Sequence, residues 1–182
     1  MTDVKQVIAR QMDRSGNTLM LGLEPVSDEE FFAENVTGFS AAWTVGHLSC
    51  VADLFSSWFD GYLRFGREFH RVFNETDVTE CIPVSRAASV DRERYPKAEL
   101  LFLFRQAMVK ALRALEEFGL EQWDAPAPPA APVSLLTGGS VWELLAVHVY
   151  WHLGELSGSM PRFAGTYTLN TVPHYFYLAP RA

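Results

Sequence analysis

Cysteine is scarce in this chain, which excludes one class of small protein. Only Cys50 and Cys81 occur among the 182 residues, so a framework of several disulfides in place of a hydrophobic core is ruled out. We expect both thiols to be reduced, although one disulfide between them is formally allowed.

Long apolar runs and an excess of positive charge are missing too. No uncharged apolar stretch reaches the roughly 18 to 20 residues that a membrane span requires, and Asp3 lies where a secretory signal would carry positive charge. The 15 Lys and Arg residues face 22 Asp and Glu residues, a formal net charge of −7, so no basic surface for phosphate groups is indicated. We therefore expect a cytoplasmic protein that binds neither nucleic acid nor membrane.

Apolar side chains are abundant. The chain is 48% hydrophobic, 13% aromatic and 20% charged, a composition typical of a globular protein with a large core. Because single domains reach about 250 residues, we expect one domain over residues 1–182. Its C-terminal tail, about residues 165–182, is rich in Tyr and Phe and should pack on the rest of the domain.

Four stretches have the apolar periodicity of long helices. We expect these helices over residues 3–21, 41–63 and 97–118, and from a capping box at 140–143 to near Pro161. Gly22 and Gly119 are the expected stops of the first and third helices, and Ser40 is the expected N-cap of the second. The spacing of Ser27 and Glu30 predicts a further, short helical turn.

Two long connections separate the later helices. Residues 64–96 are charged and broken by prolines, so we expect a crossover with one short helix, fixed to the core by Phe69, Phe73 and Ile82. The Pro- and Ala-rich residues 124–139 predict an extended connection. No segment shows a strong alternating pattern, so the expected fold is all-α, a four-helix bundle with a long crossover between its second and third helices.

Three histidines stand out on the apolar faces of two of these helices. His148 and His152 are four residues apart, so both leave one face of the last helix, which they share with Val141 and Leu145. An unpaired polar ring inside a core costs about 1 to 3 kcal/mol, and a bound metal ion would offset that cost. His47 supplies a third imidazole from the second helix. Three neutral imidazoles with a coordination position left open are typical of a catalytic metal site.

Two further side chains are candidates near this site. Glu155, three residues after His152, is our candidate catalytic residue, with roles open between a fourth ligand, an orienting group and a proton acceptor. Cys50 on the second helix is the other candidate ligand and would favour zinc. The H-E-x-x-H pattern of zinc proteases is absent because Val149 follows His148.

The segments around these histidines resemble a known family. Residues 43–48 read WTVGHL and residues 148–155 read HVYWHLGE, and with the long gap between them they are similar to the motifs of the DinB/YfiT-like superfamily of metalloenzymes. The resemblance covers about residues 4–165. It implies a bacterial-type protein with up-down-down-up connectivity, a site for zinc, nickel or iron, and homodimers. The metal ligands that it implies are His47, His148 and His152.

The resemblance leaves several functions open. Members of the superfamily include thiol-dependent S-transferases and mycothiol-dependent maleylpyruvate isomerases, so it implies a metal-dependent enzyme that uses a low-molecular-weight thiol on a small-molecule substrate. Alternatives are a metal-dependent hydrolase that uses bound water, a non-enzymatic metal-binding or stress-related module, and a metal-free histidine cluster. Four protein ligands would favour a structural site, whereas an open position would favour an enzyme.

Overall fold

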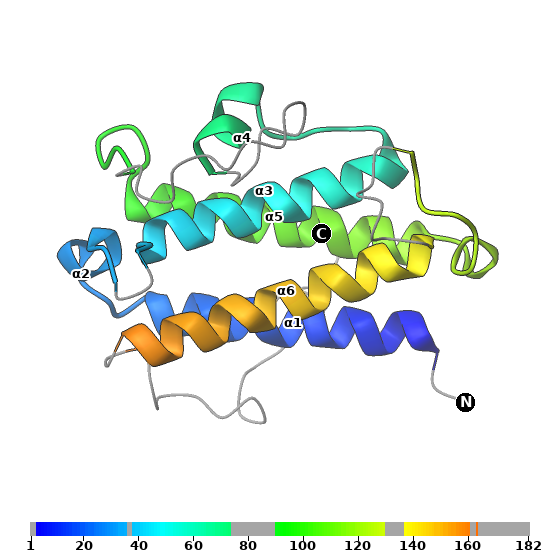
Figure 1. Cartoon of the computed structure of the whole chain (residues 1–182), viewed down its shortest axis with the longest axis horizontal. Helices are drawn as coiled ribbons and strands as arrows, with labels where there is room; N and C mark the ends of the chain where they lie inside the picture. The colour runs from blue at the N-terminus through cyan, green and yellow to red at the C-terminus, as the bar shows by residue number, and fades with distance from the viewer. Residues whose placement is uncertain (1–2, 36–37, 74–89, 130–136, 161–162, 164–182) are drawn as a thin grey trace, which may run out of the picture.

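The computed structural model describes residues 3–35, 38–73, 90–129, 137–160 and 163, and these residues are mostly helical (Figure 1). The long helices are α1 (Val4–Leu23), α3 (Ala41–Asp60), α5 (Lys97–Glu117) and α6 (Gly138–Ser159). The shorter ones are α2 (Asp28–Phe32), α4 (Arg67–Phe73) and the 3-10 helix η1 (Leu120–Gln122). The described residues form no strand, only one isolated bridge between Pro126 and Thr137. The all-α prediction is confirmed.

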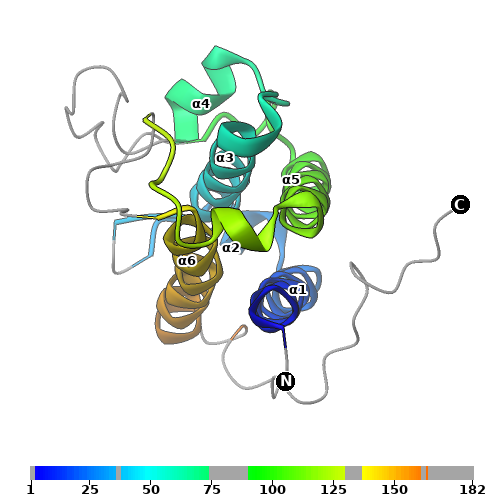
Figure 2. The ribbon, with the colours of Figure 1, turned by 90° about the vertical axis from the view of Figure 1, so that its right-hand side faces the viewer.

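The four long helices surround a common core, as the end-on view in Figure 2 shows. α3 packs on α5 and α6, and α1 packs on the same two helices, so each long helix contacts two others. Fully buried core side chains come from all four helices: Met12, Leu19, Leu48, Phe104, Met108 and Leu145. Among the described helices, none combines the length and the apolar character that a bilayer span requires.

The first long helix, α1, begins where the sequence predicts and ends later than expected, beyond Gly22. α1 begins as expected, because Asp3 Oδ1 accepts a hydrogen bond from the Lys5 amide at 3.0 Å. Its predicted stop at Gly22 is wrong, since the helix continues through this residue to Leu23. The glycine is needed for packing instead: a Cβ atom on Gly22 would lie 2.1 Å from the ring of Phe163.

α3 and α5 confirm the expected helices and differ in how they end. Ser40 is the N-cap of α3, with its hydroxyl accepting from the Trp43 amide at 3.1 Å. The helix ends earlier than expected because Gly61 takes the left-handed conformation with φ of 71°. At the end of α5 the expected role of Gly119 is wrong: Phe118 is the C-cap, and Gly119, with φ of −71°, precedes η1.

α6 starts one turn before the predicted capping box at 140–143, and that prediction is wrong. Thr137 is the N-cap: its hydroxyl accepts from the Ser140 amide at 3.2 Å, and its own amide donates to the Ser140 hydroxyl at 3.1 Å. Gly139 therefore belongs to the helix and not to the extended connection. A Cβ atom there would lie 2.4 Å from Nε1 of Trp123, so glycine is required by packing.

The segment between α3 and α5 contains the one short helix that we expected, α4, which lies over α3. Its Phe69 and Phe73 are buried, as predicted. Phe73 packs against Gly46 so closely that a Cβ atom on Gly46 would lie 2.2 Å from its ring. This contact brings the end of α4 beside the N-terminal half of α3. Ile82, the third predicted anchor, lies outside the described residues, as does the tail.

The short helical turn predicted from Ser27 and Glu30 is confirmed as α2. Ser27 caps α2, with its hydroxyl accepting from the Glu30 amide at 3.2 Å. The short helix packs on α3, and its Phe31 is fully buried.

Candidate metal centre

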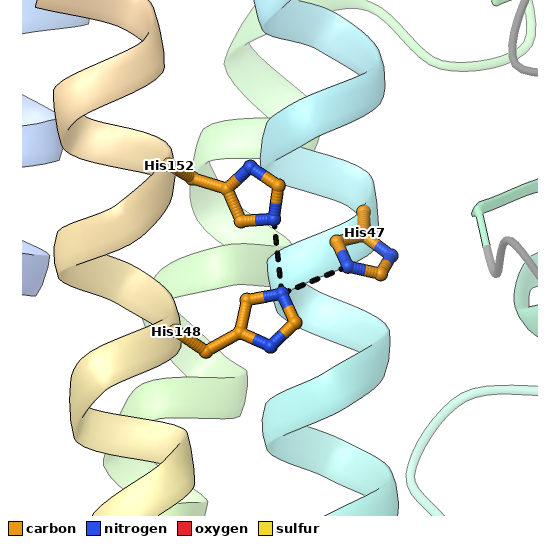
Figure 3. A group of neighbouring side chains, drawn as sticks. All are labelled: His47, His148 and His152. Carbon is orange, nitrogen blue, oxygen red and sulfur yellow. Dashed lines mark hydrogen bonds between the residues drawn. The ribbon is translucent and has the colours of Figure 1, made fainter.

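Three imidazole rings from two helices meet between α3 and α6 (Figure 3). His47 comes from α3, and His148 and His152 come from consecutive turns of α6. Nε2 of His148 lies 3.1 Å from Nε2 of His47 and 2.9 Å from Nε2 of His152. One ring nitrogen from each residue lies within 4.8 Å of the other two. The structure thus brings together the three histidines that the sequence singles out.

Aromatic packing and one backbone carbonyl fix the ring of His47. Trp43, one turn earlier on α3, stacks on this imidazole with ring centroids 4.7 Å apart and planes at 9°. Nδ1 of His47 donates to the carbonyl oxygen of Phe73 at 2.9 Å. Because a carbonyl only accepts, the hydrogen of the neutral ring lies on Nδ1. Nε2 of His47 therefore presents a bare lone pair to the cluster.

The carboxylate of Glu155 fixes the tautomer of His152 in the same way. Nδ1 of His152 lies 2.7 Å from Oε2 of Glu155, and an ionised carboxylate only accepts. Nδ1 of His152 therefore carries the hydrogen, and its Nε2 presents a second lone pair. The candidate catalytic residue Glu155 thus lies behind a clustered histidine and is not one of the clustered donors.

The three neutral rings by themselves do not supply a hydrogen for both short contacts at His148. Nε2 of His148 carries at most one hydrogen, yet it faces the lone pairs of both His47 and His152. One of the two short nitrogen–nitrogen approaches therefore has no hydrogen between its atoms. A divalent cation would accept lone pairs from all three rings, so the donor set fits the ion that the sequence predicts.

Burial keeps the cluster in the form that can bind a cation. Burial lowers the pKa of His47 to about 3, with His148 and His152 adding to the decrease against the opposing Phe73 carbonyl. The half-buried His148 has its pKa lowered to about 4, by burial first and then by His152, against the opposing charge of Glu155. Both rings are neutral at pH 7, and neutral imidazole is the metal ligand.

Cys50, the alternative ligand, is not among the clustered donors. Its thiol is buried and donates to the carbonyl oxygen of Phe69 at 3.8 Å. Burial raises the pKa of this thiol well above its usual range, and the nearby carboxylate of Asp53 raises it further. A neutral thiol of this kind is a poor metal ligand, so the described donors are three imidazole nitrogens.

The family model that describes the DinB superfamily matches residues 11–156 of the chain. The chain belongs to the DinB superfamily. The match includes all three histidines and Glu155, so the resemblance read from the sequence is confirmed for the family. No curated protein and no solved structure matches the chain. Superfamily membership by itself leaves the reaction open.

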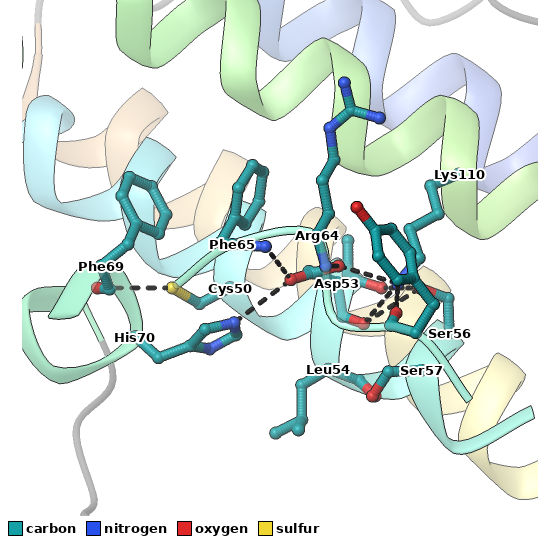
Figure 4. A network of polar contacts seen from close by, with 12 residues as sticks. Cys50, Asp53, Leu54, Ser56, Ser57, Arg64, Phe65, Phe69, His70 and Lys110 are labelled. Atoms are coloured by element: carbon teal, nitrogen blue, oxygen red, sulfur yellow. Dashed lines mark hydrogen bonds and ion pairs between the residues drawn. The ribbon is translucent and has the colours of Figure 1, made fainter. Parts of the chain in front are cut away.

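A second buried polar group lies less than two turns further along α3 in this member of the DinB superfamily (Figure 4). The carboxylate of Asp53 is fully buried. It accepts from the amides of Arg64 and Phe65, both at 2.9 Å. It also faces Nε2 of His70 at 3.2 Å and accepts from Nζ of Lys110 at 2.8 Å. These contacts, which we call the Asp53 network, join α3 to α4, α5 and the loop between α3 and α4.

The charge of Asp53 is held by these donors. Burial alone raises the pKa of this carboxyl, but hydrogen bonds from His70, Lys110 and the two amides outweigh burial and lower it to about 2. Asp53 was not among the functional residues predicted from the sequence. The signal was present, since Asp53 is the one charged residue between Ala41 and Phe59 in an otherwise apolar and neutral segment.

A cavity of about 490 Å³ lies away from the histidines. Its walls include Trp58, Phe59 and Phe118, near the C-terminal ends of α3 and α5, and none of the three histidines lines it. The cluster instead meets solvent at its third ring, since His148 is half-buried while His47 and His152 are each 7% exposed.

Proposed function

We propose that the chain binds a divalent metal ion through Nε2 of His47, His148 and His152 and acts as a metal-dependent enzyme. One observation carries the proposal: ring nitrogens of three histidines from two helices lie within 4.8 Å of one another, a donor set that fits a divalent cation. Membership of the DinB superfamily supports it. An ion held in this way supplies Lewis acidity, which lowers the pKa of a coordinated water or thiol toward neutrality.

The surrounding residues hold two of the three rings, those of His47 and His152, in the state that binds a cation. Trp43 and the Phe73 carbonyl fix the plane and the tautomer of His47. For Glu155, the contact with Nδ1 of His152 favours the orienting role among those left open by the sequence, because a carboxylate there fixes the tautomer and raises the basicity of the ligand.

Thiol transfer to a small electrophilic substrate is our first choice of reaction. Three nitrogen donors leave a coordination position for a low-molecular-weight thiol, whereas a closed structural site takes four protein ligands. Zinc, nickel and iron all accept imidazole, so all three metals are candidates. This choice of reaction is based on analogy with thiol-dependent members of the superfamily.

The wider organisation is part of the same proposal. We propose that residues 1–182 form a single domain, a four-helix bundle with up-down-down-up connectivity, on which the tail packs. We further propose a cytoplasmic homodimer that acts on a small molecule and binds neither nucleic acid nor membrane. The packing of each long helix on two others supports the bundle.

Metal analysis tests the site directly. Protein purified without a histidine tag should hold about one ion per chain, the stoichiometry of a three-imidazole site. A His148→Ala/His152→Ala variant should lose the ion. His70→Asn is the matched control, because it removes an imidazole outside the cluster and should retain the metal. Equal metal content in the wild-type chain and the double variant would remove the proposal.

Turnover tests the reaction. The chain is incubated with a low-molecular-weight thiol and a chlorinated nitrobenzene, so that a carbon–sulfur bond forms, chloride leaves and the thiol proton passes to solvent. We expect turnover with metal-loaded protein and its loss after chelation. Equal rates before and after chelation would reject thiol transfer and leave the metal site standing.

A further inference from the structure

The contacts behind His152 continue outward to the surface of α6. Oε2 of Glu155 lies 2.7 Å from Nδ1 of His152, and its other oxygen, Oε1, accepts from the indole Nε1 of Trp151 at 2.8 Å. Exposure rises along this chain of contacts. His152 is 7% exposed, the Glu155 side chain 31% and Trp151 67%. An indole at the surface is thereby connected to a ring of the candidate metal centre.

We infer that Trp151 is a positioning residue for the metal site and acts through Glu155. The inference rests on the proposed function, since it assigns a role toward the same ion. A carboxylate held at one oxygen can still turn about its side-chain bonds. Held at both oxygens, by Trp151 and by His152, it has its plane fixed, and His152 then keeps its hydrogen on Nδ1.

Helix geometry supports the pairing. Trp151 and Glu155 are four residues apart and His152 and Glu155 three apart, the two spacings at which side chains meet on a helix surface. The indole offers one donor and no acceptor. Its N–H is therefore matched to a group that only accepts, and no other residue is needed to bring the two together.

Packing does not explain why a tryptophan stands at this position. Trp142 on the same helix is fully buried, whereas Trp151 is 67% exposed. A ring so exposed contributes little to the core, so a change that keeps the ring and deletes its N–H should leave folding intact. Trp151→Phe makes this change.

The first test is zinc affinity, measured by competition with a chromophoric chelator. Trp151→Phe should bind zinc about three- to tenfold more weakly than the wild-type chain, the effect of losing one ordinary hydrogen bond at a partly exposed site. Trp58→Phe is the matched control, because Trp58 lies on α3 and packs on Phe55. Its zinc affinity should be unchanged. Equal affinities of Trp151→Phe and the wild-type chain would overturn the inference.

A double-mutant cycle separates positioning from general structural damage. In a Glu155→Ala background, Trp151→Phe should cause no further loss of zinc affinity, because its route to the ion is gone. The visible absorption spectrum of bound cobalt(II) should also change with Trp151→Phe in the wild-type background and not in the Glu155→Ala background. The same loss in both backgrounds would overturn the inference. If the wild-type chain bound none of zinc, nickel and iron, the proposed function itself would fail, a result distinct from both.

Discussion

The histidine cluster and the Asp53 network both place polar groups in the interior beside α3, and they differ in the kind of partner that these groups face. Asp53 is a buried anion that meets two amides, an imidazole and an ammonium group. His148 is a neutral ring whose Nε2 meets two lone pairs. A buried anion surrounded by hydrogen-bond donors stabilises the fold, whereas imidazole lone pairs that face one another are arranged to coordinate a cation.

The largest expected effect on stability concerns the Asp53 network. Asp53→Ala removes the buried carboxylate that accepts from the Lys110 ammonium and from two amides, and we expect the free energy of unfolding to fall by about 3 to 5 kcal/mol. Denaturant unfolding measures this change. Asp60→Ala is the matched control, since Asp60 meets the same ammonium only at 3.6 Å, and it should cost less than about 1 kcal/mol. Equal losses in the two variants would contradict the assignment.

The histidine cluster should make the stability of the chain depend on metal. Zinc at about 100 times its dissociation constant should raise the free energy of unfolding of the wild-type chain by about 2.7 kcal/mol, because only the folded chain brings the three rings together. Thermal unfolding with zinc, and then with chelator, shows the gain and its reversal. A similar gain in the His148→Ala/His152→Ala variant would place the ion elsewhere.

Acid should weaken the Asp53 network in a defined range of pH. The pKa of Asp53 is lowered from 3.8 to about 2 in the folded chain. The contribution of Asp53 to the free energy of unfolding is therefore complete above its pKa in the unfolded chain. It is lost as the pH falls through its pKa in the folded chain. The contribution amounts to about 2 kcal/mol. The difference in unfolding free energy between the wild-type chain and Asp53→Asn should shrink from about pH 5 to pH 2. A constant difference would show that the carboxylate is not the titrating group.

The smallest of these effects concerns the group behind His152. Glu155→Gln keeps the shape of the side chain and removes its charge, and we expect zinc affinity to fall about tenfold, as for other groups that support metal ligands. Glu143→Gln, an exposed change on the same helix, should leave affinity unaltered. Isothermal titration would compare the two, and a larger loss at Glu143 would contradict the orienting role of Glu155.

The helices and the three histidines were predictable because both depend on local spacing. A four-residue interval on an apolar face fixes where His148 and His152 point, and the apolar stripe of the second helix does the same for His47. The helix ends at Ser40 and Ser27 were predictable for the same reason, since an N-cap needs only its own first turn.

The errors come from residues whose role is set by distant parts of the chain. Gly22 and Gly139 look like breaks in the sequence, yet each lies within a helix and makes room for a ring, Phe163 or Trp123. Nothing local separates a glycine that ends a helix from one that allows close packing. The acceptor for His47 is a backbone carbonyl at Phe73, which any residue type would offer, so no pattern of side chains could have marked it.

The contact between Phe73 and Gly46 has a genetic consequence. Any side chain at position 46 would displace the aromatic ring that holds the end of α4, and the carbonyl that sets the tautomer of His47 belongs to that same residue. In a selection for clones that no longer accumulate metal, substitutions of Gly46 should therefore appear together with those of the histidines, although position 46 has no donor atom to offer.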